Sequence, residues 1–469
     1  MLDVSLFGID PGWAHVHNAI LHGLNSLLVL MFLLRITQSK LKAALFSLIF
    51  LAHPQHVESV AWIAERKDVL CAFFYLLGLI LYDRYQSRPT LSGYMILMSL
   101  FVLASLSKPM AVTFPAVLVI LDVFHYHKKR YFSDMVHMLK YRSAPIYIFN
   151  KIPMFILSFL VGGITIWAQN RGGAVASLEM LPYWDRLQLA SIGYAIYLRQ
   201  FLIPTDLAIF YPFDKIWQLK ELILPFGVLA CWVGFSCTLW RKYPLIIAGL
   251  CWYLITLLPV IGLMHVGLQS HADRYMYIPS IGILIALSYL VPSSTSRYRT
   301  MGVSLIAVFI CYLSLICYWQ IGYWEDRRTL FTRALNISGP HWRLHVQISE
   351  DFLDRGMPLE ALEHGRKAIM LRSDSPLAFR QMGNIYMKMN NLKTAESYYL
   401  RAINLGSSAA ILYNNLGVAL GRQNKTKDAV IAFNIALGIQ PNLYTAKINL
   451  ERYDHGGEYN TAKPEITAE

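Results

Sequence analysis

The chain has 469 residues, of which 55% are hydrophobic and 15% are charged, and its formal net charge is +13. Soluble domains usually carry about 25% charged residues, so this composition excludes an ordinary soluble protein. The positive charge does not indicate a nucleic-acid partner, because the basic residues cluster between apolar blocks, where they set membrane topology. All six cysteines lie inside apolar blocks, which argues against disulfides and a zinc site.

The apolar blocks approach the length of about 20 residues that a helix needs to cross a membrane. About ten spans are predicted, near residues 17–35, 41–53, 68–84, 92–107, 109–125, 148–168, 221–240, 244–264, 275–292 and 300–320. The segment 186–203 is ambiguous, because Arg186 and Arg199 interrupt it. After Pro54, residues 55–66 have the pattern of a short amphipathic helix that lies in the membrane interface.

Lysine and arginine are concentrated in clusters between these spans. The clusters are Arg35 with Lys40 and Lys42, Arg84 with Arg88, then Lys128, Lys129, Arg130, Lys140 and Arg142, then Arg241 with Lys242, and Arg297 with Arg299. When every cluster faces the cytoplasm, 186–203 must be interfacial or re-entrant, and everything after Tyr323 faces outward. The pattern predicts a multi-pass protein of the cell inner membrane with its C-terminal part in the periplasm, and no cleavable signal peptide.

Ionisable side chains gather in three segments that this topology places at the outer membrane boundary. They are 53–68 (HPQHVESVAWIAERKD), Lys108 in the turn at 107–109, and 272–282 (ADRYMYIPSIG). Such residues are costly in a membrane protein and usually mark a functional site, although single interfacial charges are often only topological. The candidate site residues are His53, His56, Glu58, Arg66, Asp68, Lys108, Asp273 and Arg274. A metal site at His53, His56 and Glu58 is compatible with their spacing, but hydrogen bonding by neighbouring histidines is favoured, and no metal is predicted.

The C-terminal part repeats with a period of 34 residues. Four columns share this step: Ala361, Ala395 and Ala429; Ala368, Ala402 and Ala436; Ser349, Gly383 and Gly417; and Phe352, Tyr386 and Leu420. Small and aromatic residues at this period are typical of the tetratricopeptide repeat, or TPR, in which paired antiparallel helices pack closely. We predict a membrane domain over 1–322, three repeats with a partial capping helix over 342–453, and a disordered tail over 454–469.

The sequence resembles the transmembrane and tetratricopeptide-repeat-containing O-mannosyltransferase family, particularly its bacterial relatives. The resemblance rests on the polar segments, on the repeats and on the string FGIDPGWAHVHNAILHGLNSLLVL at 7–30. The resemblance covers nearly the whole chain. It implies an all-α fold, with a polytopic bundle of the GT-C glycosyltransferase type followed by a TPR α-solenoid. It also implies a polyprenyl-phosphate sugar as donor, no cofactor, an active site on the non-cytoplasmic face, and a TPR groove that binds the acceptor protein or a partner.

The same resemblance implies roles for the candidate residues. Glu58 and Asp68 would line the catalytic cavity, and Arg274, next to Asp273, would contact the donor phosphate. Lys108 would supply a second positive charge, and His53 and His56, together with Arg66, would belong to the substrate-binding surface.

The family pattern begins before Met1 with a further span and an outward loop, and that loop carries the best candidate for the general base. Asp3 and Asp10 do not match it, so the chain is expected to be a shortened form. A transferase of a mannose-like hexose is therefore the first hypothesis, and a non-enzymatic membrane-anchored TPR scaffold is the alternative.

Overall fold

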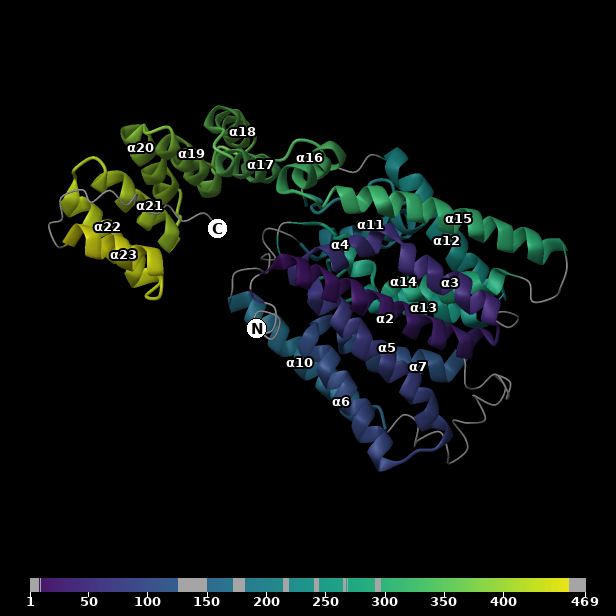
Figure 1. Ribbon diagram of the computed structural model, residues 1–469. Coiled ribbons are helices and arrows are strands. Elements are labelled where there is room, and N and C mark those ends of the chain that lie inside the picture. Colours follow the sequence, from purple (N-terminus) through teal and green to yellow (C-terminus); the bar gives the residue numbers. More distant parts are fainter. Residues whose placement is uncertain are drawn as a thin grey trace. The chain divides into compact units, whose positions relative to one another are not determined.

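A computed structural model of the chain describes residues 8, 10–124, 150–171, 182–213, 219–239, 244–264, 267, 269–291 and 297–454 (Figure 1). The chain divides into two compact units, Met1–Trp324 and Glu325–Glu469. Within the described residues the regular structure is helical, apart from an isolated bridge between Pro212 and Gln269, and the predicted all-α class is confirmed. The predicted basic clusters at 128–142 and 241–242 and the tail after residue 454 lie outside the described residues.

The first unit contains the apolar helices. Its elements are α2 (Pro11–Thr37), α3 (Lys40–Ala52), η1 (Pro54–His56), α4 (Val57–Ala61), η2 (Ile63–Glu65), α5 (Arg66–Ser87), α6 (Leu91–Ser107), η3 (Pro109–Thr113), α7 (Phe114–Phe124), α10 (Ile152–Arg171), α11 (Tyr183–Leu202), α12 (Leu219–Leu239), α13 (Pro244–Leu257), η5 (Asp273–Met276), α14 (Pro279–Leu290) and α15 (Arg297–Gly322).

Among the residues of this unit that the structure describes, three helical segments are long and apolar enough to cross a membrane, namely Pro11–Thr37, Ile152–Arg171 and Tyr298–Gly322. Other apolar helices are shorter, among them Leu91–Ser107 and Pro244–Leu257. These helices indicate a membrane protein, whereas the number of spans and their orientation stay predictions. The segment 186–203 forms most of the continuous helix α11.

Two sequence predictions about local structure are wrong. Residues 55–66 do not form one interfacial helix, because Trp62 has an extended backbone (φ −81°, ψ 109°) that separates α4 from η2. Several of their side chains, including Val57 and Glu58, are buried rather than spread on a surface. The predicted span 244–264 is helical only to Leu257, and turns follow it.

Glycine allows α13 and α14 to approach very closely, and they lie side by side in Figure 1. A Cβ atom at Gly249 would lie 2.3 Å from the carbonyl oxygen of Gly282, and one at Gly282 would lie 2.6 Å from that of Gly249. Small residues at such contacts are usual between membrane helices, where close packing replaces the hydrophobic effect as the source of stability. The adjoining core contains large, fully buried rings, such as those of Trp252 and Tyr253.

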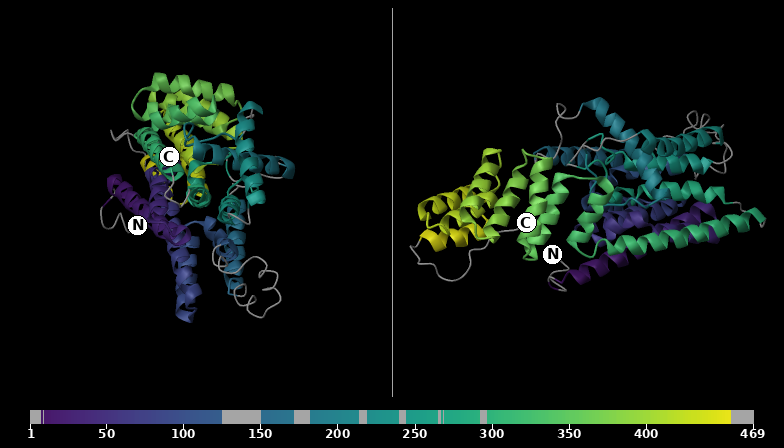
Figure 2. Two further views of the ribbon diagram at one scale, coloured as in Figure 1. Left: turned by 90° about the vertical axis from the view of Figure 1, so that its right-hand side faces the viewer. Right: turned by 90° about the horizontal axis from the view of Figure 1, so that it is seen from above.

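The second unit is a row of antiparallel helix pairs, which Figure 2 shows stacked one after another. Its elements are α16 (Arg327–Ser338), α17 (Trp342–Asp354), α18 (Pro358–Leu371), α19 (Pro376–Lys388), α20 (Leu392–Asn404), α21 (Ala410–Gly421), α22 (Thr426–Ile439) and α23 (Tyr444–Asp454).

The small-residue columns lie at the contacts between paired helices, as the 34-residue period indicates. The six alanines of the two alanine columns are completely buried. Gly383 of α19 faces the ring of Tyr399 in α20, and Gly417 of α21 faces that of Phe433 in α22. A side chain at either glycine would overlap the ring, so the column keeps the paired helices in register.

Candidate active site

The predicted polar segments converge in the first unit. The irregular stretch η1–α4–η2 connects α3 to α5, and both η1 and α4 pack against η5. Pro54 begins η1, where its fixed φ suits the first turn, and Trp62 breaks the helical path before η2. This broken path lets Glu58 and Glu65 approach the same partner, Arg274 of η5.

Arg274 forms the centre of the cluster. Its guanidinium Nη1 donates to Glu58 Oε1, and its backbone N–H donates to Glu58 Oε2 at 2.9 Å. Its Nε lies 3.4 Å from Glu65 Oε1. The guanidinium carbon lies 5.3 Å from the centre of the Trp62 ring and 5.0 Å from that of Tyr275. Contacts on the edge and on the faces of the guanidinium fix its orientation.

A second ion pair, between Lys108 and Asp68, adjoins the first. Lys108 Nζ pairs with Asp68 Oδ1, and the hydroxyl of Ser59 donates to Asp68 Oδ2 at 3.2 Å. Lys108 Nζ also lies 5.4 Å from the centre of the Tyr275 ring, which Arg274 contacts as well. The Tyr275 ring therefore links the two ion pairs into one cluster.

The side chains that carry the positive charges are more exposed than those of the carboxylates. The side chains of Arg274 and Lys108 are each 11% exposed, whereas those of Glu58 and Asp68 are each 2% exposed. The ammonium nitrogen of Lys108 is itself inaccessible, so a ligand that reaches the cluster would meet the side chain of Arg274 before the buried carboxylates. This order suits an anionic group, such as a phosphate.

Burial and ion pairing act against each other on the pKa values of the cluster. Burial raises the pKa of Glu58, although Arg274 opposes the shift. Burial alone would lower the pKa of Arg274 and of Lys108, but the partner carboxylate outweighs it and both pKa values lie above the ordinary ones. Both cations are therefore charged at neutral pH. Burial, reinforced by the neighbouring Glu58, holds the pKa of Asp273 well above its usual range, which reduces the negative charge near Arg274.

His53 and His56 are buried, and their ring nitrogens contact protein groups. His53 Nε2 donates to the carbonyl of Phe201 at 2.9 Å, and its Nδ1 accepts from the backbone N–H of Gln55 at 3.2 Å. His56 Nδ1 donates to a backbone carbonyl of α3 at 2.8 Å, and its Nε2 lies 3.2 Å from Ser280 Oγ. Burial lowers the pKa of His56 well below its ordinary value, so this ring is neutral. The role of both histidines in substrate binding stays a prediction.

The two remaining predicted residues have partners outside the ion pairs. Asp273 Oδ1 accepts a hydrogen bond of 2.8 Å from the hydroxyl of Tyr211. Arg66 donates from Nε to Asn18 Oδ1 at 2.9 Å and from Nη2 to the carbonyl of Ala14 at 3.1 Å. Arg66 therefore joins the start of α5 to α2, beside the cluster.

Sequence reasoning missed a polar network on α2. His22 Nδ1 lies 2.7 Å from the hydroxyl of Tyr277, and Asn25 Nδ2 donates to the same oxygen at 3.1 Å. Asn18 donates to a backbone carbonyl of α4 at 3.1 Å. A signal was present, because Asn18, His22 and Asn25 are spaced by four and three residues inside an apolar block, and this spacing puts them on one helix face.

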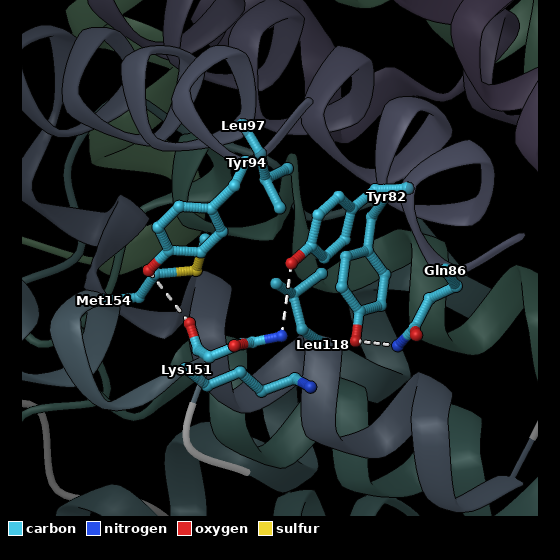
Figure 3. A pocket seen from close by; sticks show the side chains of 9 residues that line it. Tyr82, Gln86, Tyr94, Leu97, Leu118, Lys151 and Met154 are labelled. Carbon is cyan, nitrogen blue, oxygen red and sulfur yellow. Dashed lines mark hydrogen bonds between the residues drawn. The ribbon is translucent and has the colours of Figure 1, made fainter. Parts of the chain in front are cut away.

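The opposite end of α5 carries a separate polar pocket (Figure 3). There Lys151 Nζ lies 2.5 Å from Asp122 Oδ2, and the hydroxyl of Tyr82 donates to Asp122 Oδ1 at 2.8 Å. The 14 residues between Asp68 and Tyr82 correspond to about 20 Å along the helix, so this pocket is not part of the cluster. Its contacts fasten α5, α7 and α10 together.

Among the residues that the structure describes, no group of three or more His, Cys, Asp and Glu side chains could hold a metal ion. In particular, Glu58 turns to Arg274 while His53 and His56 contact other groups. The spacing of these three residues therefore does not produce a metal site.

The geometry defines an all-helical membrane protein with a buried mixed-charge cluster and a TPR-like helical repeat region. Comparison with protein families finds the tetratricopeptide repeat at residues 381–405. The predicted repeat is thus confirmed in its second copy, and the packing of α17–α23 extends the same pattern to either side.

Among known proteins, the chain is similar to the protein O-mannosyl-transferases. It is 24% identical to Protein O-mannosyl-transferase TMTC1 of Homo sapiens, over 82% of this chain and 48% of that protein. For TMTC4 of Homo sapiens the identity is 24%, over 76% of this chain and 54% of the relative. For TMTC3 of Homo sapiens the identity is 22%, over 96% of this chain and 53% of the relative.

The chain is therefore a distant homologue of the protein O-mannosyl-transferases over most of its length, which confirms the resemblance stated from its motifs. It spans about half the length of the curated relatives that it matches. This homology suggests a glycosyltransferase of the GT-C type.

Proposed function

We propose that the protein is a membrane glycosyltransferase that moves a mannose-like hexose from a polyprenyl-phosphate donor to a protein or glycan acceptor. The observation that carries the proposal is the pair of cations, Arg274 and Lys108, that separate polar segments bring together around the Tyr275 ring, with side chains more exposed than those of the carboxylates that hold them. The distant homology to protein O-mannosyl-transferases supports the same reaction class.

In the proposed reaction, an acceptor oxygen bonds to the anomeric carbon of the sugar while the bond from that carbon to the lipid phosphate breaks. The phosphate leaves with the bonding electron pair, and Arg274 and Lys108 stabilise the charge that it gains. Glu58 and Asp68 hold these two cations in place, because each carboxylate pairs with one of them. The acceptor hydroxyl loses its proton in the same step and requires a carboxylate as base.

The proposed sidedness follows from the distribution of charge along the sequence. With the basic clusters in the cytoplasm, the loops that carry Glu58, Lys108 and Arg274 face the periplasm of an inner-membrane protein. We propose that the TPR array is on the same side and binds the acceptor protein or a partner in its groove. Tetratricopeptide repeats suggest protein interaction, which supports this assignment.

The test is transfer of radiolabelled mannose from polyprenyl-phosphate mannose by membranes that contain the full chain. Replacing Arg274 alone would leave Glu58 buried without its cation and could prevent folding. The informative variant is therefore Arg274→Gln combined with Glu58→Gln, which removes both charges. We expect a loss of about 100-fold or more in the transfer rate. The matched control is Arg88→Ala, at an exposed arginine in the loop between α5 and α6.

Transfer by wild-type membranes that is unchanged in the double variant would contradict the role of the cluster. A second candidate function, a membrane-anchored scaffold, is favoured by the TPR array and by the internal pairing of Glu58 and Asp68. Under that hypothesis, the double variant would fully replace the wild-type chain in cells that lack it.

A further inference from the structure

Arg274 follows a short irregular stretch of chain that is held by contacts along its length. An isolated bridge joins the first residue of this stretch, Gln269, to Pro212. The carbonyl of Tyr211 accepts a hydrogen bond from the next backbone N–H, at 2.9 Å. The Tyr211 ring also stacks on that of His271, with the ring centres 3.9 Å apart and the ring planes inclined by 18°. The residues after α11 therefore fix the path of the chain toward Arg274.

Helix α11 itself holds the next residue of the stretch. The hydroxyl of Tyr197 accepts from the backbone N–H of Ala272 at 3.0 Å and donates to the carbonyl of the same residue at 3.2 Å. Both residues are buried. This contact gives a structural role to the segment 186–203, because α11 and the residues that follow it support the chain that enters the cluster.

The hydroxyl of Tyr211 contacts Asp273, the first residue of η5. It receives hydrogen bonds from the backbone N–H of Ala208 at 2.8 Å and from Gln200 Nε2 at 3.2 Å. With two donors on its oxygen, the hydroxyl directs its own proton to an acceptor. Asp273 Oδ1 is the nearer acceptor, at 2.8 Å, and the carbonyl of Asp206 lies at 3.1 Å.

Two separate elements thus hold η5 at successive residues. Tyr211 binds the side chain of Asp273, and Glu58 of α4 binds the backbone N–H of Arg274 at 2.9 Å. These contacts fix the backbone from which the guanidinium extends. Contacts between a guanidinium and a phosphate are directional, and a displacement of about 1 Å at a reacting centre can cost about 100-fold in rate.

We propose that Tyr211 is a positioning residue for Arg274, an inference that rests on the glycosyltransferase function proposed above. Through Asp273 and the stacked ring of His271, Tyr211 sets the place at which the guanidinium meets the donor phosphate. Tyr211 acts only through η5 and contacts neither the donor nor the acceptor. The segment after α11 is therefore part of the machinery that stabilises the leaving phosphate.

The experiment measures the kinetics of transfer from polyprenyl-phosphate mannose by membranes that contain the full chain. Tyr211→Phe removes the hydroxyl and keeps the ring on His271. We expect kcat/KM for the donor to fall by about 10–100-fold while the acceptor KM is unchanged. Asp273→Ala should give a similar loss, and Asp273→Asn should recover most of it, because the amide oxygen accepts the same hydrogen bond. The matched control is Tyr298→Phe, at an exposed tyrosine of α15.

A second comparison separates positioning from general support of the fold. The variant that combines Arg274→Gln with Glu58→Gln has no guanidinium to position, and Lys108 remains in it to contact the phosphate. Adding Tyr211→Phe to this variant should change the residual rate by less than about 2-fold, because coupled residues are not additive. A residue that only stabilises the fold would lower the rate by the same factor in both backgrounds.

The outcomes distinguish this inference from the proposed function. Active wild-type membranes together with an unchanged Tyr211→Phe variant overturn the inference and leave the function intact. Equal losses in the two backgrounds also overturn the inference alone. Wild-type membranes that transfer no sugar overturn the function and the inference together. Thermal melts of the purified variants identify loss of folding, and recovery in Asp273→Asn excludes it as the cause of the loss in Asp273→Ala.

Discussion

Replacing Gly417 by alanine would test how the repeat array is packed. A Cβ atom at Gly417 would lie 2.5, 2.8 and 2.9 Å from Cε1, Cδ1 and Cζ of the Phe433 ring. Carbon atoms in contact are normally about 3.5–4.0 Å apart. The ring would therefore have to move by about 1 Å, and Phe433 is completely buried, so α21 and α22 would have to separate.

Two opposing effects set the expected magnitude. Adding a methyl group to a packed core usually costs about 1–3 kcal/mol, whereas alanine favours a helix over glycine by about 1 kcal/mol. Since the methyl group would overlap three ring atoms, the packing cost should lie at the upper end of this range. The free energy of unfolding should then fall by a net amount of about 1–2 kcal/mol. At Gly438 of α22, a Cβ atom would have no other atom within 4 Å, so alanine there should stabilise the helix slightly.

Hydrogen exchange of the full-length protein in detergent would measure this difference locally. A loss of about 1–2 kcal/mol corresponds to about 5–30-fold faster exchange of the protected amides in α21 and α22. Adding Phe433→Leu to Gly417→Ala should remove most of the effect, because the smaller side chain leaves room for the methyl group. Equal exchange in Gly417→Ala and Gly438→Ala would refute the reasoning.

Three further predictions concern the ion pairs, the repeats and the close contact between α13 and α14. Lys108→Gln leaves Asp68 buried without its cation and should lower the free energy of unfolding by about 3–5 kcal/mol, and adding Asp68→Asn should restore most of it in thermal melts. Burial lowers the pKa of His345 to about 4, below the ordinary value of about 6.5. Between these pH values the unfolded state therefore binds more protons than the folded state. The free energy of unfolding of the first repeat should fall by about 1–2 kcal/mol as the pH falls through this window, after allowance for screening by water. His364→Asn, which removes a histidine ring nitrogen 3.0 Å from His345, should reduce this pH dependence in hydrogen exchange compared at equal pH. Gly282→Ala should lower the melting temperature of the first unit, because its Cβ would lie 2.6 Å from a carbonyl oxygen; an unchanged melting temperature would contradict that packing.

The repeat array could be predicted from the sequence because its packing is local and periodic. Each helix pair buries the same small residues, so Ala361 and Ala395 carry the same information at a fixed distance along the chain. The aromatic partners are less regular. Gly383 faces Tyr399 and Gly417 faces Phe433, but the first repeat has Ser349 in the same column. The period therefore indicates the fold, whereas the fit of each ring depends on the individual pair.

The membrane unit could be predicted only in part. Apolar blocks indicate helices, and every predicted span overlaps a helix within the described residues. Hydropathy does not indicate where a helix ends against a neighbour, and the span predicted at 244–264 stops being helical at Leu257. Polar residues inside an apolar block are also easily dismissed, although His22 and Asn25 both contact Tyr277, more than 250 residues away along the chain.

The candidate residues were recognisable by type and position, but their partners were not. In a regular helix, Glu58 and Glu65 would share one face, and nothing in their spacing would distinguish them. The extended backbone at Trp62 changes this relation, because it lets both carboxylates reach Arg274 from different directions. Glu58 then binds the guanidinium with one oxygen and the backbone N–H with the other, while Glu65 uses one oxygen and keeps the other. A single break in a short helix thus gives two carboxylates on the same arginine different sets of partners.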